Sequence, residues 1–362
     1  MSGITDMKIS VRQICFIMLA YTAVSKFILY PTALSFNSGR DLLFSSLIDF
    51  LIQGVIIWAV SFLCSRTDKT FFKLIEGTLG KVVARIIYGL FALFFIVATV
   101  IPLFEQKVYV QAIFYDTIPS LLIFLPFFAF SVYAACKGFK NIGRCADVCL
   151  PLFLVSMLFI FAMSFGEVNW QHFFPVLKTP INKVFGGSLI TAFRFVEPCW
   201  LLMFMGHFEY KKHDALKISL SYAGGALFTL LVLATFYGIY GDIAASRQFA
   251  ISKISLFFPA IELIGRIDLI ALYILEAVML FALVINIQFA VHCIIKCTGY
   301  GNRAVLSLAV NGVLLIMLIF LNNSLDALLG IWSQWMWIAF VIFANIIPLL
   351  AWTMRKRDKN EG

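Results

Sequence analysis

The stretch Arg194-Phe195-Val196-Glu197-Pro198 lies in the middle of an apolar segment, residues 184–208, that is long enough to cross a membrane. A similar stretch near the N-terminus, Thr22-Ala23-Val24-Ser25-Lys26, is followed five residues later by Pro31 within the apolar segment 11–34. A proline removes one backbone donor and clashes with the helical turn before it. We therefore expect both helices to be interrupted, the first near residues 25–29, with backbone groups freed to line a cavity.

The composition of the whole chain indicates a membrane protein. The 362 residues are 62% hydrophobic and 13% charged, whereas a soluble domain is roughly 45–50% apolar and about 25% charged. Lipid is therefore the expected solvent for most of the chain. The net charge of +9 does not indicate nucleic acid, because the basic residues lie in short loops between apolar segments. The first apolar segment has no small-residue cleavage site, so we expect it to remain as a span.

The expected fold class is an all-α integral membrane protein with ten transmembrane helices, because unpaired backbone groups cannot face lipid. The ten apolar segments are 11–34, 42–64, 86–104, 119–136, 146–166, 184–208, 216–238, 267–295, 303–321 and 330–353. In the longest outer connection, 239–266, residues 254–264 are a candidate short helix over the outer mouth or a simple tether.

The basic residues orient these spans. If the N-terminus is cytoplasmic, the inside segments hold 19 of the 28 basic residues and the outside segments hold 7. Basic residues favour the cytoplasmic side, so we expect both termini to be cytoplasmic. The positions of aromatic residues agree, since Trp335 and Trp352 bracket the last span 17 positions apart, which is about 26 Å of helix.

Ionisable side chains inside spans are costly and mark functional sites. The candidates for an intramembrane charge or a proton carrier are Lys26, Asp49, Arg194, Glu197 and Glu276. Asp49 and Glu276 are both candidate counter-charges for Lys26 or Arg194, and the sequence does not choose between them. Glu105 lies near the expected outer end of the third span, where we expect it to reach water.

Interrupted helices in corresponding positions of two halves of a chain point to a transporter binding site. Spans one and six are the first members of two sets of five, so we expect a pathway for a small polar solute between them. The candidate ligand-binding residues flank the two interruptions or, for the last three, are chosen by depth alone: Thr22, Ser25, Lys26, Glu197, Cys199, Thr99, Val100 and Leu283.

Other chemistry has no support in the sequence. The eight cysteines include no Cys-x-x-Cys and are expected to be small apolar side chains. The four histidines are scattered and no pair has the spacing of metal ligands. Since no phosphate loop and no nucleophile with a base is present either, we expect neither an enzyme nor a metal or cofactor.

Six short motifs are spread along nearly the whole chain, and their order and spacing are informative. They are Ile9-Ser10-Val11-Arg12-Gln13, Ser38-Gly39-Arg40-Asp41, Asp116-Thr117-Ile118-Pro119, Lys137-Gly138 with Arg144 and Pro151, Phe173-Phe174-Pro175-Val176-Leu177 and Gly265-Arg266-Ile267-Asp268. In these motifs the chain resembles the spore germination permease family, the B subunits of Ger-type germinant receptors in the amino acid–polyamine–organocation superfamily.

The resemblance implies a leucine-transporter-like fold in one transmembrane domain. Two inverted five-helix repeats would cover about 11–166 and 184–353, leaving 354–362 as a cytoplasmic tail. It also implies a ligand pocket between spans one, three, six and eight that takes a small germinant, usually an amino acid. The implied partners are an A subunit and a C-subunit lipoprotein in the spore inner membrane.

One departure concerns the first interruption. Amino-acid-binding relatives place small residues there, often glycine, whereas this chain has Val24, Ser25 and Lys26. Lys26 is therefore a candidate to bind a carboxylate directly or to pair with Glu197. Two functions remain open at this point. One is a receptor subunit that senses its ligand; the other is a proton-coupled amino acid transporter in which buried charges carry a proton or replace a sodium ion.

Overall fold

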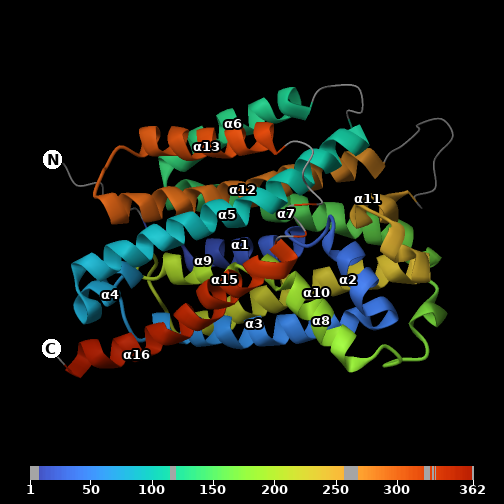
Figure 1. Ribbon diagram of the computed structural model, residues 1–362, viewed down its shortest axis with the longest axis horizontal. Helices are drawn as coiled ribbons and strands as arrows, with labels where there is room; N and C mark the ends of the chain where they lie inside the picture. The colour runs from blue at the N-terminus through green and yellow to red at the C-terminus, as the bar shows by residue number, and fades with distance from the viewer. Residues whose placement is uncertain are drawn as a thin grey trace.

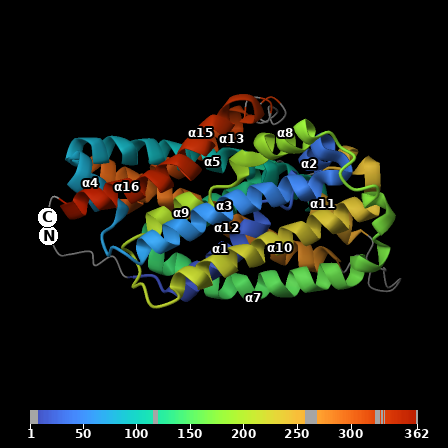
Figure 2. The same cartoon turned by 90° about the horizontal axis from the view of Figure 1, so that it is seen from below.

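The computed structural model describes residues 8–114, 120–256, 268–321, 327, 330 and 332–360, and these residues contain helices but no β-strand. Long helices lie side by side along the longest axis of the molecule (Figure 1). A second view shows α16 ending toward the same end of the molecule as α4 (Figure 2). The all-α prediction is confirmed.

The elements follow the apolar segments of the sequence. In chain order they are α1 (Val11–Val24), α2 (Tyr30–Ser38), η1 (Gly39–Asp41), α3 (Leu42–Cys64), α4 (Phe71–Leu79), α5 (Lys81–Phe114), α6 (Ser120–Lys137), α7 (Phe139–Ser164), η2 (Phe165–Glu167), η3 (Trp170–Phe173), α8 (Ile181–Thr191), η4 (Ala192–Arg194), α9 (Glu197–Phe204), α10 (Asp214–Tyr240), η5 (Gly241–Ser246), α11 (Ala250–Ser255), α12 (Asp268–Thr298), α13 (Arg303–Phe320), η6 (Trp332–Met336), α15 (Trp337–Val341), η7 (Ile342–Ile346) and α16 (Ile347–Asn360).

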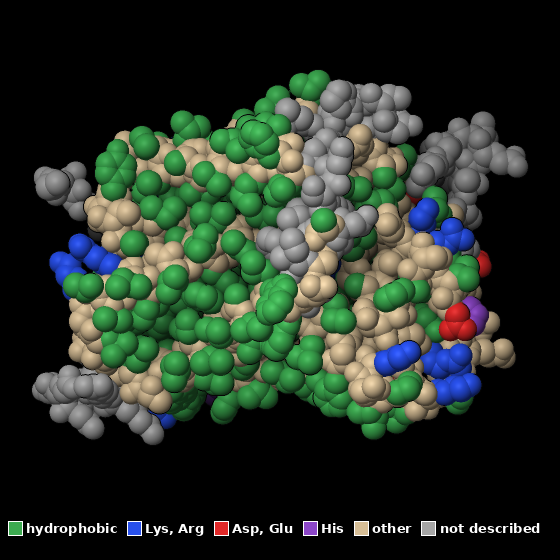
Figure 3. Space-filling view, viewed as in Figure 1, with side chains coloured by type: hydrophobic (Ala, Val, Ile, Leu, Met, Phe, Trp, Pro, Cys, Tyr) green, Lys and Arg blue, Asp and Glu red, His purple; other side chains and the backbone are tan. Residues whose placement is uncertain are grey.

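The helices have the length and surface of membrane spans. In the described part of the chain, eight helical stretches are long and apolar enough to cross a membrane, and two shorter apolar helices, Val11–Val24 and Phe124–Lys137, accompany them. Hydrophobic side chains cover the middle of one face, whereas Lys and Arg gather at its two ends (Figure 3). A band of this kind suits the hydrocarbon core. The chain is a multi-pass membrane protein, and the count of ten stays a prediction.

The first expected interruption is confirmed. Ser10 caps α1 in a reciprocal capping box with Gln13, and the helix ends at Val24. The next helix begins at Tyr30 and carries Pro31 in its first turn, where no backbone donor is needed. Residues 25–29 therefore form a non-helical link in the middle of the membrane region.

The second expected interruption is confirmed as well. Helix α8 ends at Thr191, and a short 3₁₀ turn leads to Arg194. Helix α9 then starts at Glu197 with Pro198 in its first turn. The two helices that carry a charge beside a proline are thus both discontinuous.

Two expected elements differ in extent. The third span, expected at 86–104, is the 34-residue helix α5 (Lys81–Phe114), which continues past Pro102. A short helix, α11 (Ala250–Ser255), overlaps the helix expected at 254–264 only at residues 254 and 255. Residues 257–267 lie outside the described residues, so that expectation stays a prediction. Helix α11 is buried, and the backbone amide of Ala250 donates to the carbonyl of Ile28 in the first interruption, at 3.1 Å.

Helix α1 lies against α10, α7 and α12 in the centre of the molecule. Its approach to α10 depends on a glycine: a Cβ atom at Gly225 would lie 2.5 Å from the Leu19 carbonyl oxygen and 2.8 Å from the Thr22 Cβ. At the adjacent Gly224, a Cβ would lie 3.4 Å from the end of the Leu19 side chain. A larger side chain at Gly225 would therefore clash with the backbone of α1, whereas one at Gly224 would meet only a flexible side chain.

This difference gives a matched pair of variants. Gly225→Ala should lower the free energy of unfolding by about 1–3 kcal/mol, because the added methyl group must push two helices apart. Gly224→Ala should leave stability unchanged or raise it slightly, since alanine favours a helix. Thermal unfolding of the purified protein measures both, and equal effects of the two variants would contradict the proposed close packing.

Candidate functional site

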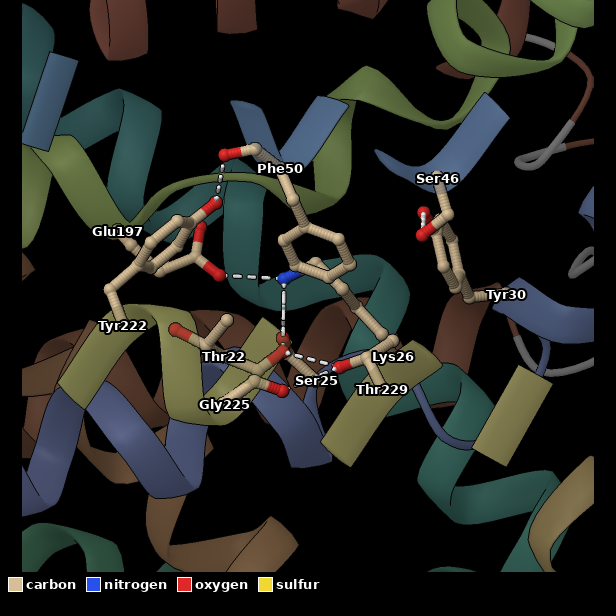
Figure 4. A network of polar contacts seen from close by, with 10 residues as sticks. All are labelled: Thr22, Ser25, Lys26, Tyr30, Ser46, Phe50, Glu197, Tyr222, Gly225 and Thr229. Atoms are coloured by element: carbon tan, nitrogen blue, oxygen red, sulfur yellow. Dashed lines mark hydrogen bonds and ion pairs between the residues drawn. The ribbon is translucent and has the colours of Figure 1, made fainter. Parts of the chain in front are cut away.

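A buried ion pair joins the two interruptions. The Nζ atom of Lys26, in the first interruption, lies 2.6 Å from Oε1 of Glu197, the first residue of α9. Both side chains are 0% exposed. Figure 4 shows the pair between the chain segments that carry it. Because each charge would be strongly unfavourable alone in the membrane interior, each requires the other.

The remaining donors of Lys26 hold the unwound chain. An ammonium group has three donors, and the other two contacts go to the Thr22 carbonyl and the Ser25 hydroxyl, each at 3.2 Å. Thr229 of α10 donates its hydroxyl to the same Thr22 carbonyl at 3.4 Å. The Thr22 carbonyl, which loses its helical hydrogen bond where α1 ends, is therefore satisfied by Lys26 and Thr229.

Aromatic rings surround the ammonium. Nζ lies 4.3 Å from the ring centre of Phe195 and 5.7 Å from that of Phe50, and cation–π attraction is strong where water is absent. In contrast, Oε2 of Glu197 and the Thr22 hydroxyl oxygen are buried with no hydrogen-bond partner among the described residues. Since unsatisfied buried oxygens are costly, these two atoms are available to accept from a ligand.

A second buried pair lies beside the first. Arg194 donates through both terminal nitrogens to the carboxylate of Glu105, with one contact of 2.9 Å. Glu105 is 2% exposed, so the prediction that it reaches water is wrong. The physical reason is the length of α5, which continues nine residues beyond Glu105.

Asp49 and Glu276 are not the counter-charges of Lys26 or Arg194. Asp49 accepts a hydrogen bond from the Ser188 hydroxyl of α8, and neither oxygen of Glu276 has a hydrogen-bond partner within the described part of the chain. Both carboxyl groups are buried. Their participation in proton transfer stays a prediction.

The structure brings four of the predicted ligand residues together, namely Thr22, Ser25, Lys26 and Glu197. Cys199 lies two residues along α9 and contacts the Phe343 carbonyl through Sγ at 3.1 Å. Of the residues chosen by depth, Thr99 bonds to its own helix at Phe95, and Val100 and Leu283 are buried. Ligand contact by any of these residues stays a prediction.

A cavity beside Ser25 shows which face of α5 is turned toward the site. It is lined by Ala98 and Ile101 of α5, by Arg194 and by Phe340, so Thr99 and Val100 are not part of its wall. Its volume is about 10 Å³, which is room for about one water molecule. Sequence spacing alone does not give helix rotation, and this is why Ala98 and Ile101 were missed.

Aromatic contacts close the site along the helices. Tyr21 of α1 lies with its ring centre 3.5 Å from that of Trp200 in α9, and Trp200 donates to Asn286 of α12 at 2.7 Å. On the other side, Tyr30 donates to Ser46 at 2.9 Å. Side chains from α1, α2, α3, α9 and α12 therefore enclose the site in this structure.

Two histidines that are distant in sequence are neighbours. The rings of His207 and His292 lie 5.2 Å apart, and Phe139 contacts both. These two histidines are thus far apart in the sequence but adjacent in the structure. The described residues contain no group of three or more metal-binding side chains.

The ion pair predicts a non-additive pair of substitutions. Lys26→Met should destabilise the protein by about 3–5 kcal/mol, because it leaves the Glu197 carboxylate buried and unpaired. Adding Glu197→Gln should cost less than the sum of the two single changes, since the double variant buries no charge. Thermal unfolding of all four proteins gives the coupling, and strict additivity would show that the two groups do not interact.

Comparisons with known proteins agree with this geometry. A family model described as "Spore germination protein" matches residues 8–327, whereas a search of curated proteins found no match. Among solved structures, the crystal structure of MhsT in complex with L-phenylalanine matches with a TM-score of 0.62 and 12% identity, covering 95% of this chain and 98% of that chain. At this identity the match shows the fold alone, which is leucine-transporter-like. The family that matches is one of permeases rather than of enzymes. The chain belongs to the spore germination protein family.

Proposed function

We propose that this protein is the ligand-binding B subunit of a spore germinant receptor, with its pocket at the two helix interruptions. The observation that carries the proposal is the buried pair of Lys26 and Glu197, which ties one interruption to the other. In this proposal the protein lies in the spore inner membrane with both termini in the cytoplasm. It signals to an A subunit and a C-subunit lipoprotein.

The charges of the site favour an amino acid as the ligand. A free amino acid carries a carboxylate that suits Lys26 and an ammonium group that suits Glu197. Oε2 of Glu197, which has no hydrogen-bond partner among the described residues, offers a further acceptor for the ligand's ammonium. The leucine-transporter-like fold holds an amino acid, L-phenylalanine, in MhsT, and this supports the same class of ligand here.

Exchange of partners gives the site its selectivity. An amino acid that enters between Lys26 and Glu197 breaks one ion pair and forms two, so no buried charge is left alone. A molecule that lacks either charge would leave Lys26 or Glu197 unpaired in a dry environment, at a cost of several kcal/mol. The site should therefore reject amino acid esters and amines even when their side chains fit.

The same exchange provides a signal. The closed site has room for about one water molecule, so a ligand can bind only if the segments around the interruptions move apart. A ligand that binds the open state alone shifts the population toward it. The first interruption is hydrogen-bonded to the buried helix α11 through Ile28 and Ala250, so in this proposal its movement passes to α11 and from there toward a partner subunit.

A ligand screen on the purified protein tests this proposal. At least one free amino acid should raise the melting temperature, whereas its methyl ester and its decarboxylated amine should not. Lys26→Met should abolish that rise. Lys8→Met, which removes the exposed pair of Lys8 with Glu209, should retain it.

The same variants can be compared in spores. Lys26→Met should lose the germination response to that amino acid, while the protein is still inserted in the membrane. A free amino acid and its ester that stabilise the protein equally, or a full response of Lys26→Met, would contradict the proposed role of the pair.

A further inference from the structure

A groove of about 680 Å³ lies between α6, α7 and α12, away from the central ion pairs. Its walls are mostly apolar, with Phe130 of α6, Val148 of α7 and Ala277 of α12 exposed along it. In a protein that spans a membrane, exposed apolar side chains face lipid. The groove is thus open to the bilayer.

Two polar side chains, Asn141 and Arg144, stand in the wall of this apolar groove. They are three residues apart on α7 and therefore share one face of that helix. Arg144 is exposed, and neither side chain has a hydrogen bond or ion pair with any other described residue. Both head groups are therefore free to bind something that lies in the groove.

The depth of Arg144 suits a lipid headgroup. Helix α7 begins at Phe139, so Arg144 lies five residues, or about 7.5 Å, from the helix end. This distance places it near the boundary between headgroups and hydrocarbon. A guanidinium left alone at that boundary is unfavourable, whereas its planar fork of donors matches a phosphate group.

We propose that the groove binds one anionic phospholipid. Arg144 and Asn141 donate to the phosphate, and an acyl chain lies along the apolar walls between α6, α7 and α12.

The size of the groove favours a lipid over a helix of a partner protein. A transmembrane helix about 10 Å wide and 30 Å long occupies roughly 2,400 Å³, several times the volume of the groove. A cavity of 300–1,000 Å³ is typical for a small-molecule ligand. The groove therefore fits an acyl chain and part of a headgroup.

Nearby charge favours an anionic lipid over a neutral one. Lys137, at the end of α6, lies at the same end of the groove but outside its wall, with Nζ 5.1 Å from the ring centre of Tyr133. Basic residues near a membrane surface attract anionic lipid. Lys137 adds attraction, and Arg144 with Asn141 add the specific contact.

The packing of α6 explains why the groove exists. This helix packs mainly against α13 and α12 rather than against α7, its neighbour in sequence. The two helices meet at Gly138, which has a φ of 80°, and a Cβ there would lie 2.4 Å from an Arg303 nitrogen. The helices are thus joined tightly at Gly138 and separated further along, where the lipid would lie between them.

The test uses the purified full-length chain and two lipids with the same acyl chains. Dioleoylphosphatidylglycerol should raise the melting temperature by about 5 °C at saturation, and dioleoylphosphatidylcholine should not. Arg144→Gln should abolish the rise, and so should Ala277→Leu, which fills the groove. Lys137→Gln, which removes the same charge outside the groove, should retain most of the rise. Lys26→Met should retain it too, because the lipid site is separate from the ligand site.

Native mass spectrometry provides a second measurement if a variant unfolds too readily for melting curves. The wild type should retain one phosphatidylglycerol molecule that Arg144→Gln loses. Soluble glycerol phosphate should not stabilise the protein, since it lacks the acyl chain. Equal effects of Arg144→Gln and Lys137→Gln, equal effects of the two lipids, stabilisation by glycerol phosphate, or no bound lipid at all would each overturn the proposal.

Discussion

A charged group inside a membrane is costly, and a partner of opposite charge offsets much of that cost; two ion pairs of this kind organise the centre of the protein. Lys26 and Glu197 meet at 2.6 Å with no exposed surface, and Arg194 and Glu105 form a second buried pair beside them. Each ion pair links a helix interruption to another segment of the chain. The first connects the two interrupted helices to each other, and the second connects the later interruption to α5. The closed arrangement of the site depends on both.

Local signals in the sequence were sufficient for the fold class and for the interruptions. Pro31 and Pro198 act on their own helices, and a charge in an apolar segment is visible without any knowledge of packing. Helix rotation is not visible in this way. The sequence therefore left the partner of Lys26 open. It also did not show that Ala98 and Ile101 of α5 line the cavity beside Ser25; ligand contact by Thr99 and Val100 stays a prediction. The sequence placed Glu105 at the end of its span because the apolar segment stops at residue 104, whereas the helix itself, α5, continues to Phe114.

Two kinds of site share one helix scaffold. Helix α12 provides Asn286, which accepts from Trp200 beside the central site, and also Ala277, which lines the proposed lipid groove. The central site is built from interrupted helices whose backbone has alternative partners, so it is suited to rearrange. The groove is built from continuous helices joined at a tight glycine turn, so it is suited to remain in place. A bound lipid would then stabilise the frame against which the interrupted helices move.

The central claim is that a ligand separates Lys26 from Glu197. Solid-state NMR in liposomes measures this directly, through the dipolar coupling between the ¹⁵N-labelled side chain of Lys26 and the ¹³C-labelled carboxyl of Glu197, with Glu197→Gln to assign the signal. Without ligand, the coupling should report a direct contact, as the 2.6 Å separation requires. With a saturating amino acid that stabilises the protein, the coupling should disappear. A coupling that persists unchanged at saturation would contradict the exchange of partners on which the proposed function rests.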